Sequence, residues 1–392
     1  MNTTNEKKPI RNWLLLIILS YTTFIFNTTE FIPIGLLTDI AMDFHISESR
    51  ASLLISVYAW FVAVMSLPLM IIIGKCDFRK ILLIIIGCFV VSHLFSAISS
   101  NFIMLLISRL GVACSHAIFW SFISPLAIHI APEEKKETAM SMIIAGTSLA
   151  MIVGMPLGRI IGLNLGWRYS FGCIGLAALI AFILLVVMLP SVPNKQETSL
   201  KSVPTVFKSY AIRGIYIFTF LVVIAHYIGY SYIEPFLRQI VGMTDNLTTL
   251  TLIIFGVAGI GASMLFSKWY DKNRRVFMLS ISAGMASVLL LMLCAASNQY
   301  ISIANCILWG MAFTAFNLVT EFEVIRHASR YTTIAVAIYS SIFNVGIGCG
   351  AFLGGVVLSD LSLSYIGYMG GTIAIIAFIF ILKRQMSILG KT

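Results

Sequence analysis

The sequence predicts an all-α integral membrane protein of twelve transmembrane helices, arranged as two pseudo-symmetric six-helix bundles. The composition is the first observation behind this prediction. Of the 392 residues, 59% are hydrophobic and only 11% are charged, whereas a soluble domain carries about 25% charged residues. Such a chain cannot cover its surface with polar groups, so most of that surface must face lipid.

Apolar segments long enough to cross a bilayer recur along the whole chain, which is the second observation. A spanning helix needs roughly 20 predominantly apolar residues. No short apolar segment with a small-residue cleavage site precedes the first span, so we expect no removable signal peptide. The twelve candidate spans lie near residues 13–37, 51–73, 80–98, 102–130, 138–162, 169–189, 212–236, 248–267, 276–296, 300–322, 332–358 and 364–382.

The basic residues are distributed unevenly between the two sides of the predicted membrane. Of the 26 Lys and Arg residues, 21 fall in segments on one side and four on the other, while Arg109 lies inside a span. The side with the excess is the cytoplasm by the positive-inside rule, so both termini are expected there. This topology accounts for the net charge of +10, and no nucleic-acid partner is expected.

The two halves of the chain echo each other at a shift of about 200 residues, which indicates a parallel repeat. "GKCDFRK" at 74–80 follows the second span, and "SKWYDKNRR" at 267–275 follows the eighth. Glu30 in the first span is matched by Glu234 in the seventh. The predicted domains are an N-terminal six-helix bundle, a cytoplasmic linker and a C-terminal six-helix bundle, over residues 1–190, 191–211 and 212–392.

Several motifs resemble the Major Facilitator Superfamily along nearly the whole chain. "GKCDFRK" is similar to a shortened form of that family's motif between spans two and three, without its usual second glycine. Arg109 in "LISRLGV" lies where the family has a buried arginine, and "GTSLAMIVGMPLG" resembles the antiporter motif of span five. "FNTTEFIPIGLL", "SHAIFWS" and "AHYIGYSYIEPF" are similar to the bacterial sugar efflux transporters of the drug:proton antiporter-like branch.

The resemblance implies a proton-coupled antiporter that exports arabinose- or galactoside-type sugars by alternating access across the bacterial inner membrane. Its implied partners are a small sugar, protons and the bilayer, it is expected to function as a monomer, and no cofactor is expected. The alternative is a drug or nucleoside exporter of the same fold. A membrane enzyme is not expected, because the sequence contains no HExxH, P-loop, GxSxG or paired-cysteine motif. Seven singly scattered cysteines suggest neither disulfides nor a metal site.

Glu30 is the first candidate for proton coupling and substrate binding. A charged carboxylate at mid-helix costs roughly 2.5–3.5 kcal/mol, and ionisable groups inside membrane segments are functional by default. Asn27, three residues earlier, points the same way on a helix and is a substrate-binding candidate. The alternative for Glu30 is a structural carboxylate bonded to neighbouring Thr or to backbone freed by Pro33. The motif implies that Arg109 shapes the proton pathway, although an ion pair that locks the bundle is the other interpretation.

His116 and Trp120 in span four are predicted to bind substrate. They follow Arg109 by seven and eleven residues, which places all three on one helix face. An imidazole can hydrogen-bond a hydroxyl, and an indole ring can stack on the C–H face of a pyranose. The alternative for His116 is a packing role.

Span seven supplies substrate candidates from the second half. "AHYIGYSYIEPF" places His226, Tyr230 and Glu234 at successive spacings of four, which predicts a stripe on one helix face. The alternative is an aromatic belt at the outer interface, to which Tyr232 and Glu234 would belong. Asn344 in span eleven is the further candidate, with an interhelical hydrogen bond as its alternative. These residues predict one central site built from spans one, four, seven and eleven.

Cytoplasmic charges are predicted to act as conformational latches. Asp77, Arg79 and Lys80 are the predicted gating residues, which hold neighbouring helix ends together. In span five, a strip of small residues is expected to let helices approach closely, and Pro156 to bend the helix. The strip consists of Gly146, Gly154 and Gly158. A second latch is expected from Asp271, Arg274, Arg275, Glu321 and Glu323.

Overall fold

Every element in the part of the chain that the structure describes is helical, as the sequence predicts. The computed structural model describes residues 7–73, 76–193, 203–328 and 332–389. Among these residues, eleven helices are long and apolar enough to cross a membrane. They correspond to eleven of the twelve predicted spans. The remaining span, 276–296, falls on α14 (Arg274–Leu290) and the short α15 (Met292–Ala295).

The contacts between Cα atoms divide the chain into two units. Unit 1 consists of residues 1–35 and 64–197, and unit 2 consists of residues 36–63 and 198–392. Helix α4 (Leu53–Ile73) therefore contributes its first half to unit 2 and its second half to unit 1. The division into domains at 1–190, 191–211 and 212–392 stays a prediction, and residues 194–202 of that linker lie outside the described residues.

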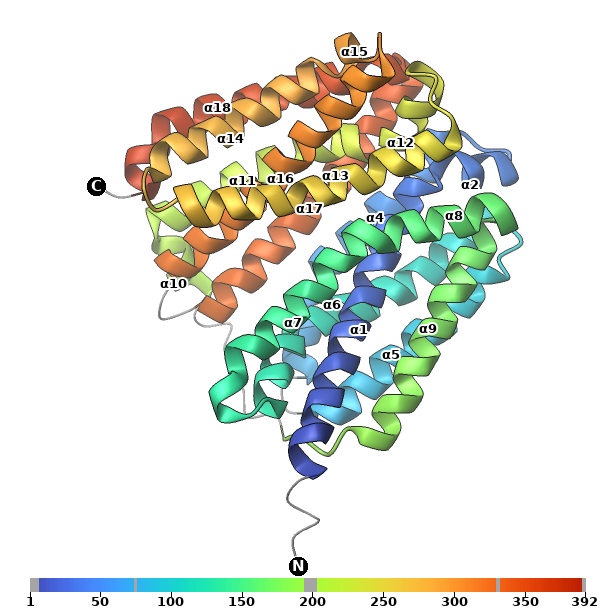
Figure 1. The fold of residues 1–392 in the computed structure, drawn as a ribbon, viewed down its shortest axis with the longest axis vertical. Helices are drawn as coiled ribbons and strands as arrows, with labels where there is room; N and C mark the ends of the chain where they lie inside the picture. The colour runs from blue at the N-terminus through green and yellow to red at the C-terminus, as the bar shows by residue number, and fades with distance from the viewer. Residues whose placement is uncertain (1–6, 74–75, 194–202, 329–331, 390–392) are drawn as a thin grey trace, which may run out of the picture. The chain divides into compact units, whose positions relative to one another are not determined.

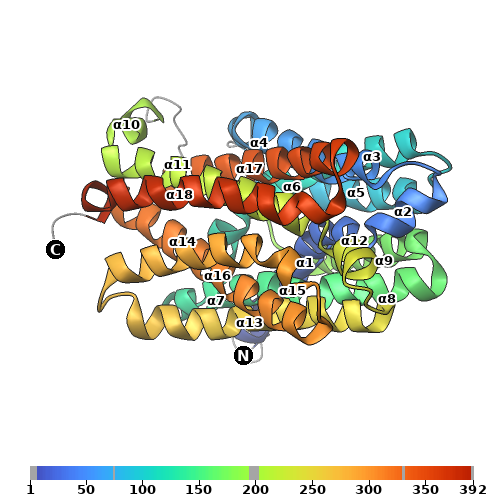
Figure 2. The same cartoon turned by 90° about the horizontal axis from the view of Figure 1, so that it is seen from above.

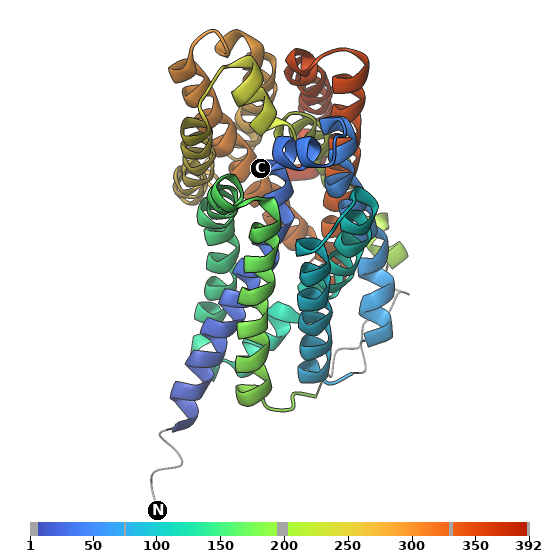
Figure 3. The same ribbon diagram turned by 90° about the vertical axis from the view of Figure 1, so that its right-hand side faces the viewer.

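In unit 1, α1 is the central helix (Figure 1). It packs against α6, α7, α8 and α9, and Figure 3 shows α1 in dark blue alongside α9 in green. Asp77 and Asn101 cap α5 and α6 by accepting backbone N–H groups. The bounds are α1 Lys7–Gly35, α5 Phe78–Ala97, α6 Phe102–Ile130, η1 Glu133–Lys135, α7 Lys136–Leu149, η2 Ala150–Gly154, α8 Met155–Leu165 and α9 Trp167–Met188.

The glycine strip of span five lies against α1. A methyl group added to any of Gly146, Gly154 or Gly158 would collide with an atom of that helix. The close approach that the sequence predicts therefore exists, and it joins α7, η2 and α8 to α1. The α1 residues that the added methyl groups would meet are Ser20, Thr28 and Ile32.

The π-helical turn η2 keeps this strip on one face. Gly146 and Gly154 are eight residues apart, which on a regular α-helix would separate their directions by about 80°. The turn closes with a bond from the Met155 N–H to the carbonyl of Ala150, five residues earlier, and so absorbs one residue. Pro156 follows directly, and it lacks the N–H that a regular α-helix would use.

In unit 2, α11 packs against both α17 and α18, which run alongside it in Figure 2. Helices α13 and α14 both pack against α16. The bounds are α2 Leu37–Asp43, α3 Glu48–Ala51, α10 Val203–Lys208, α11 Tyr210–Tyr230, α12 Ile233–Pro235, η4 Phe236–Ile240, α13 Asp245–Trp269, α16 Gln299–His327, α17 Thr332–Asp360, η5 Leu363–Tyr365 and α18 Ile366–Leu389.

Span seven is interrupted where the sequence predicts a continuous stripe. Helix α11 ends at Tyr230, and the chain turns before α12. Pro235 explains the break, because its ring clashes with the carbonyl four residues earlier, that of Ser231, and offers no N–H in return. The prediction that His226, Tyr230 and Glu234 lie on one face of one helix is therefore wrong, and Glu234 lies beyond the turn.

Candidate functional site

Two helices of unit 1 bring three predicted site residues together. The Oε2 atom of Glu30 in α1 lies 3.6 Å from Nε2 of His116 in α6. The indole N–H of Trp120, also in α6, donates to that same nitrogen at 2.7 Å. Helix α6 is unbroken over this stretch, so the seven-residue spacing presents both Arg109 and His116 to α1.

Trp120 determines how His116 can act. Because an indole nitrogen only donates, His116 Nε2 must accept and carries no proton. Glu30 then receives no hydrogen bond from this nitrogen, since 3.6 Å exceeds hydrogen-bonding range and two acceptors face each other. One added proton would let Glu30 and His116 Nε2 form a hydrogen bond, but only in place of the bond from Trp120, because this ring nitrogen has a single lone pair.

Arg109 is positioned by two residues that the sequence analysis missed, Thr29 and His93. Its NH1 atom donates to Thr29 Oγ1 at 2.8 Å, and that oxygen lies 2.8 Å from His93 Nε2. A guanidinium only donates, so Thr29 must give its own hydrogen to His93. His93 Nδ1 then donates to the Phe89 carbonyl at 2.9 Å. This buried chain holds Arg109 close enough to act on the charge of Glu30.

Asn27 is engaged within unit 1. Its Nδ2 atom donates to the Thr23 carbonyl at 3.0 Å and to Thr147 Oγ1 at 3.4 Å. The first bond stays within α1, and the second joins α1 to α7. A role of Asn27 in substrate binding stays a prediction.

His226 is enclosed by aromatic rings of unit 2. Its ring stacks on Phe313 with 3.4 Å between centroids and on Tyr230 with 4.8 Å. Trp309 Nε1 donates to His226 Nδ1 at 3.0 Å, so a neutral ring carries its proton on Nε2. Nε2 is buried and has no hydrogen-bond partner among the described residues. A buried donor left unpaired costs about 1–3 kcal/mol, which points to a partner such as a bound hydroxyl or water.

Asn344 in α17 offers the complementary group. Its Nδ2 atom donates to the Ser340 carbonyl at 3.0 Å within the helix. Its Oδ1 atom is buried and, within the described part of the chain, accepts no hydrogen bond. His226 Nε2 and Asn344 Oδ1 are thus a buried neutral donor and a buried neutral acceptor without a partner among the described residues, as are the hydroxyls of Thr219, Ser231, Thr248 and Ser282 in the same unit.

Glu234 belongs to a polar network of unit 2 and is fully buried, not placed at an outer interface. Its Oε1 accepts from Arg238 NH1 at 3.1 Å, and its Oε2 accepts from Thr38 Oγ1 at 2.8 Å. Arg238 also lies 3.0 Å from Asp245 and 3.8 Å from Asp39. Both oxygens of Glu234 are thus occupied by protein groups, and its binding of substrate stays a prediction.

Tyr232 is likewise a buried structural residue and not part of an aromatic belt. Its hydroxyl lies 2.6 Å from Ser52 Oγ and donates to the Ala351 carbonyl at 3.0 Å. These contacts join the turn after α11 to the end of α3 and to α17 within unit 2.

The predicted gating residues tie α5 to the end of α9. Asp77 Oδ1 accepts the backbone N–H groups of Arg79 and Lys80, and Ser191 Oγ donates to Asp77 Oδ2 at 2.6 Å. Arg79 NH2 donates to the Val186 carbonyl at 2.8 Å. Desolvation acts to raise the pKa of Asp77, but the hydrogen bond from Ser191 and those from the backbone lower it overall. The first two residues of the predicted motif lie outside the described residues.

Unit 2 contains a comparable polar cluster. Arg274 NH2 and the Tyr270 hydroxyl each lie 2.5 Å from Glu323 Oε1. Arg274 and Glu323 are predicted from sequence to belong to such a set, whereas Tyr270 is not, since it carries no charge that would single it out. No group of three His, Cys, Asp or Glu residues suited to a metal ion occurs in the described ranges.

The chain is similar to known membrane transporters. Residues 19–335 match the Major Facilitator Superfamily. Crystal structures of a bacterial homologue of the human lysosomal transporter Spinster share its fold. The inward-facing occupied form aligns with a TM-score of 0.71 at 15% identity, over 97% of this chain and 96% of that chain. The inward-facing unoccupied form aligns with a TM-score of 0.70 at 15% identity, over 97% of each chain.

Proposed function

This chain belongs to the Major Facilitator Superfamily, and on that premise we propose that it exports a neutral sugar of arabinose or galactoside type in exchange for protons. Membership in the family makes it a multi-pass membrane transporter of a small molecule. The proposed setting is the inner membrane of a bacterium, where it works as a monomer with both termini in the cytoplasm.

The proposal of proton coupling rests on Glu30 Oε2 and His116 Nε2, two hydrogen-bond acceptors that lie opposite each other. A proton that binds there joins α1 to α6 through a hydrogen bond between Glu30 and His116, which replaces the bond from Trp120 to His116, and release of the proton restores the bond from Trp120. Glu30 is the only acidic residue in α1, so this step has no competing carboxylate on that helix. Arg109, held by Thr29, supplies the opposite charge.

The unused groups of unit 2 support a neutral substrate. His226 Nε2 can donate to a sugar hydroxyl, and Asn344 Oδ1 can accept from one. Neither group carries a charge in this arrangement, so neither favours an ionic substrate. The Tyr230 ring is stacked between His226 and Phe255 and so supports the His226 ring, while Trp120 of unit 1 stays a predicted stacking partner for a sugar. Alternating access would expose such a site to each side in turn, with Asp77, Arg79 and Lys80 as part of the gate.

The test is transport by the purified protein in proteoliposomes under an imposed pH gradient. The wild type is expected to move a labelled galactoside, and Glu30→Gln is expected to fold normally and lose at least about 90% of gradient-driven transport, since its amide cannot take up and release a proton. The matched control is Glu134→Gln, which removes an exposed carboxylate of η1 and should keep full activity. Full gradient-driven transport by Glu30→Gln would remove that residue from coupling.

A substrate panel tests the sugar separately. Arabinose, galactosides, a nucleoside and a lipophilic cation are compared under the same gradient. Transport of the nucleoside or the cation without any sugar would replace the proposed substrate by that of a drug or nucleoside exporter.

A further inference from the structure

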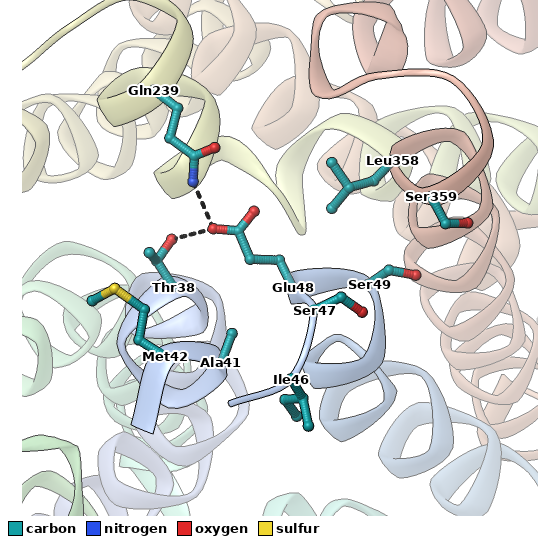
Figure 4. A pocket seen from close by; sticks show the side chains of 10 residues that line it. All are labelled: Thr38, Ala41, Met42, Ile46, Ser47, Glu48, Ser49, Gln239, Leu358 and Ser359. Carbon is teal, nitrogen blue, oxygen red and sulfur yellow. Dashed lines mark hydrogen bonds between the residues drawn. The ribbon is translucent and has the colours of Figure 1, made fainter. Parts of the chain in front are cut away.

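Unit 2 contains a cavity of about 350 Å³ whose lining residues include none of the groups assigned above to substrate or coupling. Helices α2 and α3, the turn between them, η4 and the end of α17 line it. Figure 4 shows Thr38, Glu48 and Gln239 pointing toward one another in this cavity. Glu48 is only partly buried, so it can exchange protons with the solvent that fills the cavity.

The single hydroxyl hydrogen of Thr38 cannot bond both of the carboxylates beside it. Its Oγ1 atom lies 2.8 Å from Glu48 Oε1 and 2.8 Å from Glu234 Oε2. A hydroxyl has one hydrogen, and an ionised carboxylate has none. With both carboxylates ionised, one of the two contacts would place bare oxygen lone pairs against each other. The three oxygens therefore require one further proton.

The partners of the two carboxylates decide where that proton resides. Glu234 accepts from the guanidinium of Arg238 at 3.1 Å and from the backbone N–H of Thr38 at 3.4 Å. Apart from its contact with Thr38, Glu48 is bonded within the described residues by a neutral amide N–H, that of Gln239, at 2.6 Å. A carboxylate beside a guanidinium favours its charged form more than one beside an amide.

We propose that Glu48 is a proton-binding site: its Oε1–H donates to Thr38, and Thr38 donates to the ionised Glu234. The chain of donors then runs in one direction, from Gln239 through Glu48 and Thr38 to Glu234 and its partner Arg238. The hydrogen on Glu48 serves the contact with Thr38, and the hydrogen on Thr38 serves the contact with Glu234. The site lies in unit 2 and is separate from Glu30, so it goes beyond the proposed coupling step.

The surrounding charges favour a proton at Glu48 over a further negative charge. Carboxylates outnumber arginines among the described groups of the neighbouring elements, and Arg238 already lies within 4 Å of three of them. Desolvation acts to lower the pKa of Arg238, but the hydrogen bond and charge of Glu234, then the charges of Asp245 and Asp39, raise it overall. The charges of Glu234 and Arg238 act on Glu48 directly. The other titratable or charged residues on the neighbouring elements are Asp39, Asp43, His45, Arg50, Asp245 and Asp360.

Loss of this proton would loosen the wall of the cavity. Glu48 and Glu234 would then compete for the single hydrogen of Thr38, and one of the two bonds would break. Helix α2 would lose its tie either to α3 or to α12. The proton thus acts as a ligand that joins three short elements of unit 2.

The experiment is infrared titration of the full-length protein in detergent, with glutamate labelled by ¹³C at its carboxyl group. The wild type should show a protonated carboxyl band that disappears on alkaline titration and is absent from Glu48→Gln. Thr38→Val should move the midpoint of that band toward acid by about half a pH unit or more, because one hydrogen bond to the protonated form is lost. Thr251→Val is the control, since Thr251 is another buried threonine of unit 2, and its hydroxyl donates to the Leu247 carbonyl within its own helix.

An unchanged carboxyl band in Glu48→Gln would overturn the proposal, as would equal midpoints in Thr38→Val and Thr251→Val. If Glu48→Gln does not fold, judged by circular dichroism, the two threonine variants decide alone. Glu30→Gln should keep the Glu48 band. The two proposals are therefore tested independently. A protein that fails to export sugar can still show the Glu48 band, and a protein without the band can still export sugar.

Discussion

Single threonine hydroxyls decide what the neighbouring charged residues can do. Thr29 accepts from Arg109 and must give its hydrogen to His93, while Thr38 stands between two carboxylates with one hydrogen to share. The Thr29 hydroxyl is fully buried, while Thr38 lies in the wall of the cavity. Removing such a hydroxyl takes one hydrogen-bond partner from a buried charged or polar neighbour, which costs free energy of unfolding.

Thr29→Val should therefore destabilise the protein by about 1–3 kcal/mol, because Arg109 NH1 loses the acceptor Thr29 Oγ1. Thermal unfolding in detergent measures the effect. Thr22→Val is the matched control on the same helix, since its hydroxyl only bonds the Ile18 carbonyl one turn back, at 2.7 Å. Equal melting temperatures for the two variants would contradict a special role of Thr29.

The site residues could be predicted from sequence only where a helix continues unbroken. Arg109, His116 and Trp120 lie on one face because α6 runs without a break from Phe102 to Ile130. Glu234 does not share a helix face with His226, because Pro235 interrupts the helix. Thr29 and His93 were missed for another reason. They act through contacts among three helices, α1, α5 and α6, which spacing along one helix does not encode.

At the scale of helices, small residues determine which elements pack closely. Gly146 brings the backbone of α7 against the carbonyl of Ser20 in α1, and Gly310 does the same in unit 2 against the carbonyl of Phe255. Both contacts involve rigid backbone, so no side chain can turn aside to make room. The sequence predicted the strip in span five from composition and spacing, while its partner helix came only from the fold.

Gly146→Ala should destabilise the protein by about 1–3 kcal/mol, because its new methyl group forces α7 away from α1. Gly87→Ala in α5 is the control. There the added carbon lies 3.7 Å from the nearest atom, an ordinary contact, and alanine favours a helix by about 1 kcal/mol. Chemical or thermal unfolding of both variants in the same detergent gives the comparison. A Gly146→Ala protein as stable as Gly87→Ala would mean that the two helices separate without cost.

At the scale of the whole molecule, composition and charge placement predicted the class of protein. The low fraction of charged residues required lipid as solvent, and eleven spanning helices and the family match agree with that requirement. The substrate could not be predicted in the same way, because sugar, nucleoside and drug exporters of this fold use similar polar and aromatic groups. The orientation in the membrane still rests on the unequal distribution of Lys and Arg.

The orientation can be tested with two reporter positions at opposite ends of α5. Cys76 precedes this helix and Ser100 follows it, and both are exposed. The 20 residues of α5 span about 30 Å, the thickness of the apolar part of a bilayer. In an otherwise cysteine-free protein, a membrane-impermeant maleimide applied to intact cells should label Ser100→Cys and spare Cys76 until the cells are permeabilised. Labelling of Cys76 in intact cells would invert the topology.

The turn at 150–154 has a consequence for comparing this gene with its relatives. The π-helical turn contains one residue more than a regular α-helix would have there. Deletion of a single codon within it would therefore give a regular helix in which Gly146 and Gly154 are seven positions apart and still point the same way. Insertion of one more codon there would add a residue that this turn does not accommodate. Alignments to relatives with a regular helix should therefore carry a one-residue gap between these glycines, and drift in the length of this segment should run toward loss.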